Sequence, residues 1–259
     1  MSSPFALVQL SDFHIGAGWA DGDPAAGVAA AVEAVLATVP EPDAVLVSGD
    51  LADGATDAEY ERALELLAPL QAPAFVLPGN HDDRAGLRRH FGLAGAGADP
   101  VCYAADLGPL RLLVLDSTIP GEDAGALDAE RLAWLEGELA AAPESPALIA
   151  LHHPPLVTGV PAWDDIGLAE ESRRSLGDVV ARHPQVRRIV AGHVHRTIAG
   201  QLAGRSVLAV PSTYVQGRLD FSARELRLAA EPAGFAVHAV LDGEVTSHIQ
   251  PVVTSRSSG

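Results

Sequence analysis

The sequence has a single cysteine and few basic residues. Cys102 can form neither an intrachain disulfide nor a thiolate zinc cluster, and we expect it to be buried in a strand. Only 17 Lys and Arg stand against 34 Asp and Glu, and the formal net charge of -17 disfavours nucleic acid and anionic membranes as partners. An acidic protein that binds an anion needs another source of positive charge, and ten histidines make metal ions the obvious candidate.

Long apolar runs and several catalytic motifs are also missing. No stretch approaches the roughly 18 apolar residues of a membrane span, and Met1–Pro4 lacks the features of a secretory signal, so we expect a cytoplasmic protein without membrane contact. There is no Gly-x-Ser-x-Gly elbow and no P-loop. Gly16-Ala17-Gly18 is followed by Asp21 where a dinucleotide fingerprint needs Gly, which disfavours a Rossmann domain.

The first 200 residues alternate short apolar runs with amphipathic stretches, the pattern of an α/β fold in which helices cover a sheet. The expected strands are Phe5–Leu10, Asp43–Val47, Ala74–Leu77, Leu110–Leu115, Ala147–Leu151 and Val186–Ala191. The expected helices are Ala25–Val39, Thr56–Leu67, Arg84–Phe91, Asp128–Ala141 and Glu170–His183.

After residue 198 the pattern changes to short strands, at Val207–Val210 and Phe235–Leu241. Asp242-Gly243 separates the latter from Val245–Pro251 as a type I′ hairpin turn would. We expect these strands to form a second sheet packed on the first, within one domain over residues 1–253. The small and polar residues 254–259 predict a flexible tail.

Five polar clusters follow the ends of predicted strands. They are Asp12-Phe13-His14, Gly49-Asp50, Gly79-Asn80-His81-Asp82, His152-His153 and Gly192-His193-Val194-His195. In α/β sheets the ligand site lies beyond the carboxyl ends of the strands, so these groups should converge there. Each cluster alone is compatible with turn chemistry. Together they predict a metal centre, because Asp, His and Asn suit Mn²⁺, Fe or Zn²⁺ and a carboxylate can bridge two ions.

The chain resembles the calcineurin-like metallophosphoesterases, whose complete motif set is matched by Asp12-x-His14, Gly49-Asp50-x-x-Asp53, Gly79-Asn80-His81-Asp82, His152 and Gly192-His193-x-His195. The resemblance implies a β-sandwich of two mixed sheets flanked by helices. Within that superfamily, Gly79–Arg84 and His152-His153-Pro154-Pro155 resemble the class III cyclic nucleotide phosphodiesterases and their glycerophosphodiesterase relatives.

By this resemblance, two divalent metal ions (Mn, Fe or Zn) are the implied cofactors. Asp12, His14, Asp50 and His195 would hold one ion; Asp50, Asn80, His152 and His193 would hold the other, with Asp50 bridging. The two ions would leave a cationic site for a phosphodiester. They would also lower the pKa of a shared water, so that a metal-bridging hydroxide attacks the ester.

The resemblance also assigns catalytic roles to His81 and Asp53. His81 follows the ligand Asn80 and would contact the phosphate and protonate the leaving alkoxide, while Asp53 would orient its imidazole. A helix-approach cap is the alternative for Asp53. His153 is left outside the metal set, as either an outer partner or a packed residue.

The implied activity is hydrolysis of 3′,5′-cyclic AMP to 5′-AMP. Glycerophosphodiesters or 2′,3′-cyclic nucleotides are the alternative substrates, and a non-catalytic protein-binding scaffold is the alternative from another class. The loop Leu156–Leu168 should overhang the metals, where Trp163 would either stack on a base or pack within its own loop. A homo-oligomer is possible, since relatives often form one.

Overall fold

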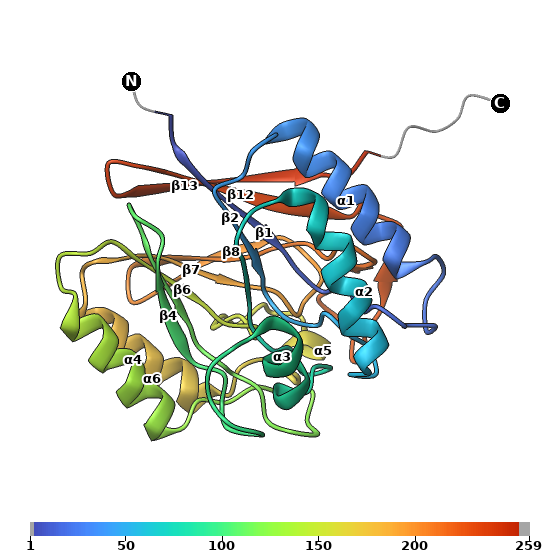
Figure 1. Ribbon diagram of the computed structural model, residues 1–259. Helices are drawn as coiled ribbons and strands as arrows, with labels where there is room; N and C mark the ends of the chain where they lie inside the picture. Colours follow the sequence, from blue (N-terminus) through green and yellow to red (C-terminus); the bar gives the residue numbers. More distant parts are fainter. Residues whose placement is uncertain (1–2, 254–259) are drawn as a thin grey trace.

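The computed structural model describes residues 3–253, in which two mixed β-sheets pack face to face between layers of helices (Figure 1). This is the predicted α/β sandwich. The tail predicted at residues 254–259 lies outside the described residues. Among the described helices, none is long and apolar enough to cross a membrane.

The first sheet combines strands from both ends of the chain. Its spatial order is β13 (Glu244–Pro251), β12 (Gly234–Leu241), β1 (Phe5–Leu10), β2 (Ala44–Val47) and β3 (Ala74–Val76). Strands β1, β2 and β3 are parallel, so their carboxyl ends lie at one edge. The turn between β12 and β13 has positive φ at both Asp242 and Gly243, as the predicted type I′ hairpin requires.

The second sheet is also mixed, with parallel strands at its centre. Its spatial order is β4 (Tyr103–Asp106), β5 (Arg111–Val114), β6 (Ala147–Ala150), β7 (Val186–Ala191), β9 (Arg205–Ala209) and β8 (Ile198–Leu202). Strands β5, β6, β7 and β9 run parallel, and β4 and β8 close the two edges antiparallel. A separate two-stranded ribbon pairs β10 (Gln216–Gly217) with β11 (Leu228–Ala229).

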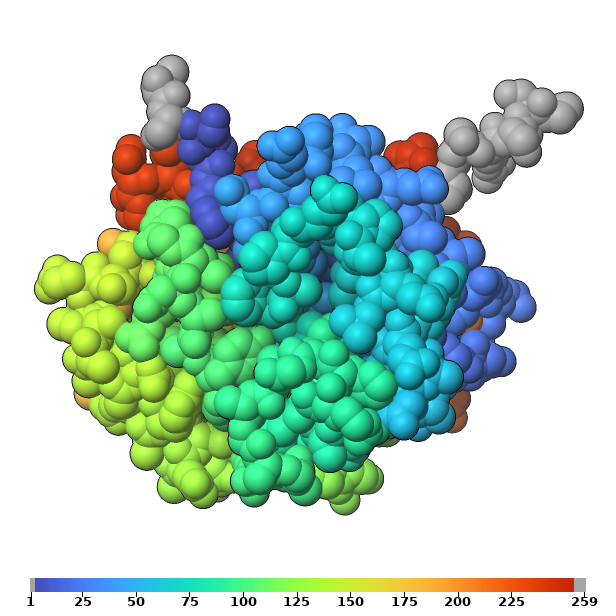
Figure 2. Space-filling view, viewed as in Figure 1, coloured from blue at the N-terminus to red at the C-terminus, as the bar shows by residue number. Residues whose placement is uncertain are grey.

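The described helices are α1 (Pro24–Thr38), α2 (Asp57–Leu67), the 3₁₀ turn η1 (Ala68–Leu70), α3 (Arg84–Phe91), α4 (Ala129–Ala141), α5 (Pro161–Asp164) and α6 (Glu170–Arg182). Four of them, α1, α2, α3 and α4, begin after a residue whose side chain caps the helix. Thr56 and Glu59 form a capping box at α2, and Asp128 caps α4 through the backbone N–H of Arg131. Helices α1, α2 and α3 form much of one continuous face of the molecule (Figure 2).

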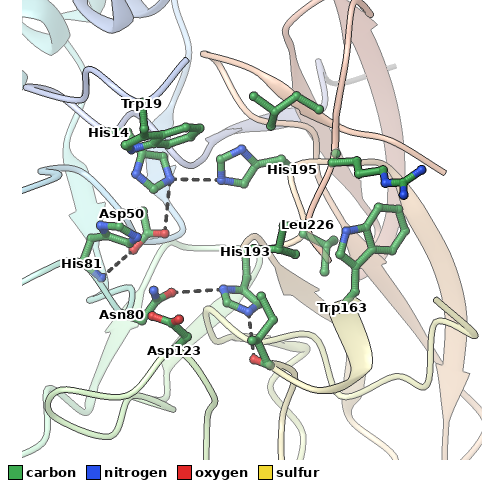
Figure 3. A pocket seen from close by; sticks show the side chains of 15 residues that line it. His14, Trp19, Asp50, Asn80, His81, Asp123, Trp163, His193, His195 and Leu226 are labelled. Carbon is green, nitrogen blue, oxygen red and sulfur yellow. Dashed lines mark hydrogen bonds and ion pairs between the residues drawn. The ribbon is translucent and has the colours of Figure 1, made fainter. Parts of the chain in front are cut away.

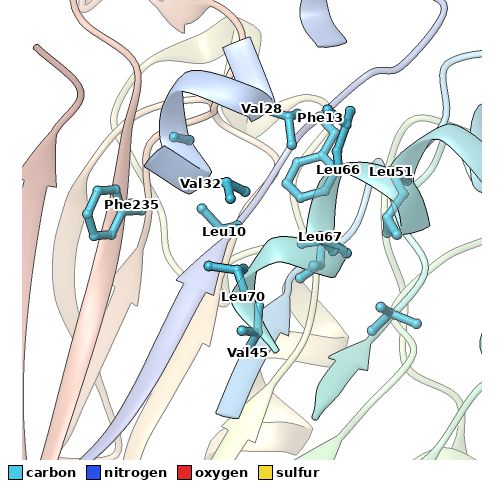
Figure 4. Close-up of a cluster of buried hydrophobic side chains, with 14 of the residues drawn as sticks. Leu10, Phe13, Val28, Val32, Val45, Leu51, Leu66, Leu67, Leu70 and Phe235 are labelled. Atoms are coloured by element: carbon cyan, nitrogen blue, oxygen red, sulfur yellow. The ribbon is translucent and has the colours of Figure 1, made fainter. Parts of the chain in front are cut away.

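Alternation along the strands separates the core into layers. In β1, Leu7 packs between the two sheets while Val8 packs under the helices α1 and α2. In β6, Leu148 faces the first sheet and Ile149 faces the helices α4 and α6. The cluster under α1 and α2 includes Leu10, Val28, Val32, Val45, Leu66, Leu67, Leu70 and Phe235 (Figure 4). Both sheets are therefore covered on both faces.

A hydrogen-bonded polar chain crosses the apolar layer between the sheets. His238 on β12 contacts Gln9 Oε1 at 2.9 Å, and the Gln9 amide donates to Ser48 Oγ at 2.7 Å and to the Ala191 carbonyl. Burial lowers the pKa of His238 to about 3, so this imidazole is neutral at pH 7. His238 is thus a structural residue that joins β12 to β1.

Two expectations require correction. The late strands do not form a sheet of their own, because β12 and β13 extend the first sheet while β8 and β9 extend the second. An apolar run predicts a strand but not its partner, so sheet membership could not be read from the pattern. Cys102 precedes β4 and is only partly buried, although burial raises the pKa of its thiol to about 11.

One buried ion pair ties the two sheets together beside the polar clusters. Arg84, at the start of α3, donates through Nε to Asp116 Oδ2 at 2.8 Å, and Asp116 follows β5 of the second sheet. Its guanidinium also donates to the carbonyls of Ala98 and Thr118. Because Asp116 is fully buried, the guanidinium of Arg84 offsets the cost of removing this carboxylate from water.

We predict that Arg84→Met lowers the free energy of unfolding by about 3–5 kcal/mol, because it leaves the Asp116 carboxylate buried without its cation. Urea unfolding at a fixed Mn²⁺ concentration measures this loss. The matched control is Arg62→Met, which breaks an exposed pair with Glu65 and should cost less than about 1 kcal/mol. Equal losses in the two variants would contradict a structural role for the buried pair.

Candidate metal centre

The predicted ligands converge because they follow strands whose carboxyl ends meet. Asp12 and His14 follow β1, and Asp50 follows β2. Asn80 follows β3, while the remaining histidines, His152, His193 and His195, follow β6 and β7 of the other sheet. All seven predicted ligands lie in two touching clusters at this edge. Figure 3 shows those that line the cavity, namely His14, Asp50, Asn80, His193 and His195.

The first cluster joins His14, His195, Asp12 and Asp50. The Nε2 atoms of His14 and His195 lie 3.0 Å apart. Asp50 Oδ2 lies 3.4 Å from His14 Nε2, and Asp12 Oδ1 lies 3.8 Å from His195 Nε2. This is the set that the resemblance assigned to one ion.

The second cluster joins His152, His193, Asn80 and the same aspartate. His152 Nε2 lies 3.2 Å from His193 Nδ1, and Asn80 Oδ1 is 3.1 Å from both nitrogens. Asp50 Oδ2 is 3.3 Å from His152 Nε2. A single carboxylate oxygen of Asp50 therefore touches both clusters, which is the position that a bridging ligand requires.

The outer nitrogen of each of the four histidines meets an oxygen acceptor. The contacts are His14 Nδ1 to Asp53 Oδ1 (3.1 Å), His152 Nδ1 to the Ser48 carbonyl (2.8 Å), His193 Nε2 to the Ile166 carbonyl (2.9 Å) and His195 Nδ1 to the Val215 carbonyl (2.9 Å). In a neutral ring, donation of the N–H to these oxygens leaves the inner nitrogen with a bare lone pair. The inner nitrogens of His14 and His195, 3.0 Å apart, therefore repel each other unless a cation lies between them. Asp12 Oδ2 is also buried and lacks a hydrogen-bond partner among residues 3–253. The donor set fits divalent metal ions.

Burial keeps most of these histidines neutral, as ligation demands. It lowers the pKa of His195 to about 4 and also lowers the pKa values of His14 and His193. For His152, burial is outweighed by the Asp50 carboxylate, and the pKa rises to about 9. A cation on this nitrogen would have to displace a proton, so metal affinity should rise with pH.

The backbone at the centre is strained. Nine non-glycine residues in the described range have positive φ, and five of them are predicted ligands: Asp12, His14, Asp50, His193 and His195. Such conformations cost free energy and are concentrated at functional sites. Gly49 and Gly79 permit the close approach, because a Cβ at Gly49 would lie 2.4 Å from His152 Nδ1 and one at Gly79 would lie 2.1 Å from Asp50 Oδ1.

His81 and Asp53 lie beside the first cluster. His81 Nδ1 is 3.2 Å from the Asp53 carbonyl and 3.3 Å from Asp53 Oδ1, which leaves Nε2 as the nitrogen that can face the cavity. Burial lowers the pKa of His81, but the carboxylates of Asp50 and Asp53 outweigh it and the net shift is upward. Asp53 contacts His14 as well, so it orients both rings. The helix that follows is capped by Thr56 rather than by Asp53.

Two neighbouring residues have supporting contacts that the motifs did not reveal. Asp82 accepts from the backbone N–H groups of Leu51, Ala52 and Gly79, which joins the loops after β2 and β3. His153 is fully buried; its Nδ1 contacts Ser117 Oγ at 2.8 Å and its Nε2 contacts the Asp123 carbonyl at 3.0 Å. Since both ring nitrogens are engaged, His153 acts as a packed neighbour of His193.

A cavity of about 440 Å³ opens above the ligands. Its walls include Trp163, Val194 and, from the ribbon β10–β11 and its loop, Leu226 and Leu228. Trp163 is only 3% exposed and packs with Val160 of its own loop and with Val194, Ala209 and Ala223 from other parts of the chain. The sequence missed Trp19 and Asp123 as lining residues, because neither belongs to a motif.

Comparisons with known proteins agree with this geometry. Residues 5–197 match the family model described as calcineurin-like phosphoesterase. The chain is 37% identical over 224 residues to the 3′,5′-cyclic adenosine monophosphate phosphodiesterase CpdA of Pseudomonas aeruginosa, covering 83% of this chain and 80% of that protein. It is 33% identical to the probable glycerophosphodiester phosphodiesterase GpdQ of Arcobacter nitrofigilis, covering 77% and 74%. A dimetal phosphatase from Danio rerio shares the fold with a TM-score of 0.73 at 16% identity, covering 97% of this chain and 98% of that one.

We predict that Asp50→Ala lowers the affinity for both ions by at least ~100-fold, because losing a shared ligand should cost more than losing an outer partner. His14→Ala and His193→Ala should each weaken mainly one ion. Elemental analysis of Mn²⁺-loaded, desalted protein measures the content. The control is Asp123→Ala: Asp123 lines the same cavity but lies outside both clusters, so this variant should keep both ions. Normal metal content in Asp50→Ala would contradict the bridging role.

Proposed function

Because the chain belongs to the calcineurin-like phosphoesterase family, we propose that it hydrolyses 3′,5′-cyclic AMP to 5′-AMP at the site around Asp50. The observation that carries the proposal is the position of Asp50 Oδ2, 3.4 Å from His14 Nε2 and 3.3 Å from His152 Nε2 on the floor of an open cavity. The curated relatives are named as phosphodiesterases, and the chain is a phosphoric diester hydrolase. A non-catalytic scaffold is therefore not the role of this chain.

The charge of the site determines what it can bind. Asp50 lines the cavity and Asp12 lies buried in the same cluster, so without cations the two carboxylates would repel a phosphodiester. Two divalent ions bound there would reverse that charge, clamp the phosphate and lower the pKa of water to near neutrality. Arg227 is the one Lys or Arg side chain among the residues that line the cavity in the described part of the chain, so the protein itself adds little positive charge.

His81 would supply the proton that the leaving alkoxide needs. Its contacts with the Asp53 carbonyl and carboxylate fix the ring through Nδ1, so a proton on Nε2 would point into the cavity. Its backbone N–H donates to Asp50 Oδ1 at 3.0 Å, which ties the acid to the bridging carboxylate. The arrangement supports acid catalysis beside the residues that would hold the metals.

The size and lining of the cavity favour a substrate with an apolar or planar group beside the phosphate. About 440 Å³ falls within the 300–1,000 Å³ that small-molecule sites usually occupy. Glycerophosphodiesters and 2′,3′-cyclic nucleotides remain the alternative substrates, because the same metal centre would serve any diester. One relative is named as a probable glycerophosphodiester phosphodiesterase, which supports testing them together.

The proposal is tested with a substrate panel. Purified protein with Mn²⁺ should show its highest kcat/KM on 3′,5′-cyclic AMP, compared with 2′,3′-cyclic AMP and glycerophosphoethanolamine, and chelation should abolish every activity. Product analysis should give 5′-AMP. A higher kcat/KM on glycerophosphoethanolamine would replace the proposed substrate with the alternative.

We predict that His81→Ala lowers kcat on cyclic AMP by about 10²–10⁴-fold while metal content is unchanged, because the variant removes a proton donor and no ligand. The matched measurement uses bis(p-nitrophenyl) phosphate. Its phenolate leaves without protonation, so the same variant should lose far less activity on this ester. Equal losses on the two substrates would contradict a role for His81 as the acid.

A further inference from the structure

Trp19 holds an unusual position for a large aromatic side chain. It lies in the loop between β1 and α1, is 47% exposed and lines the cavity above the metal ligands. Figure 3 shows its indole over His14, on the side of the cavity opposite Trp163. The centroids of the Trp19 and His14 rings are 5.2 Å apart with the planes at 88°.

Several contacts fix this exposed ring. The indole Nε1–H donates to Asp53 Oδ1 at 2.9 Å, and the Tyr214 ring packs against it at 5.5 Å. The Tyr214 hydroxyl donates to the Ala20 carbonyl at 2.8 Å, which holds the loop itself. A side chain that is pinned but still half open has already lost its rotamer freedom, so a ligand that covers it loses little further entropy.

The two tryptophans of the cavity differ in what they offer. Trp163 is 3% exposed, and a Cβ on Gly217 would lie 3.0 Å from its ring, so packing accounts for this residue. Trp19 leaves about half of its surface uncovered beside two predicted ligands, His14 and His195. Packing does not explain an exposed indole at this place, whereas contact with a planar group of the substrate would.

We propose that Trp19 is the surface on which the planar ring of the substrate stacks, with Asp53 holding the indole in place. The inference rests on the proposed function and extends it to the organic part of the ester. Asp53 Oδ1 contacts His14 and Trp19, and it lies 3.3 Å from His81 Nδ1. One carboxylate thus fixes the stacking surface relative to a metal ligand and to the acid.

The kinetic test compares Trp19→Ala with Trp19→Phe on cyclic AMP and on glycerophosphoethanolamine, which has no ring. Stacking predicts that Trp19→Ala raises KM for cyclic AMP by about 5- to 150-fold, the equivalent of about 1–3 kcal/mol, with little change on the ringless ester. Trp19→Phe loses the N–H but keeps a ring that can stack, and for this reason it should retain most of the affinity for cyclic AMP.

A purely positioning role predicts a different result. If Trp19 acted only by holding Asp53, both variants would lower kcat on both esters, and that outcome would overturn the proposal. Metal content and thermal unfolding of each variant show whether the site and the fold are intact. Trp134→Phe, on helix α4 and away from the cavity, is the control and should match the wild type on both esters.

A binding test separates this inference from the proposed reaction. Titration of the Mn²⁺-loaded protein with 5′-AMP should quench tryptophan fluorescence, and ribose 5-phosphate, which lacks the base, should not. The quench should disappear in Trp19→Phe and persist in Trp134→Phe. If it persists in Trp19→Phe, or if both ligands bind equally well, the proposal is wrong. This test remains decisive even if cyclic AMP proves not to be turned over, an outcome that would refute only the proposed substrate.

Discussion

The site depends on one carboxylate oxygen that must lie between two groups of histidines. Asp50 Oδ2 is within 3.4 Å of His14 Nε2 and 3.3 Å of His152 Nε2, although these residues follow strands of different sheets. The two sheets must therefore pack in one register for the site to exist. Leu7, Leu46, Leu112 and Leu148 fill the layer between them, and the pair Arg84–Asp116 ties their loops together. The apolar core thus sets the distances on which the chemistry depends.

Holding these groups together costs free energy, and the neighbouring structure offsets it. Five predicted ligands have positive φ, and two carboxylates lie buried next to each other. Burial raises the pKa of Asp12 to about 6, with the charge of Asp50 adding to the effect, so the pair is unfavourable without cations. Backbone groups make the arrangement rigid: the Ser48 and Val215 carbonyls orient His152 and His195. A preorganised site of this kind loses little entropy when metals bind.

The bounds of several strands and helices were predicted correctly from the sequence, because a local pattern of residues determines them. Strand β1 was predicted with its observed bounds, and α3 likewise, because apolar runs and cap residues are local signals. The seven proposed ligands were assigned from the resemblance to the metallophosphoesterases, and the fold brings them together because the ends of the parallel strands meet at one edge. Sheet membership was missed, since β12 pairs with β1 across more than two hundred residues and no local pattern encodes a partner. Trp19 was missed for a similar reason: its importance lies in contacts with Asp53 and Tyr214, which the fold alone brings together.

Substrate choice depends on different parts of the chain from metal binding. The proposed ligands follow buried strands, whereas the cavity walls come from the loop that carries Trp19, from α5 and from the ribbon β10–β11. Loops can change without disturbing the core, so one metal centre can serve several esters. This agrees with relatives of similar identity that are named for cyclic AMP and for glycerophosphodiesters. The metal motifs therefore identify the family and the reaction, while the substrate has to be determined from the residues that face its organic part.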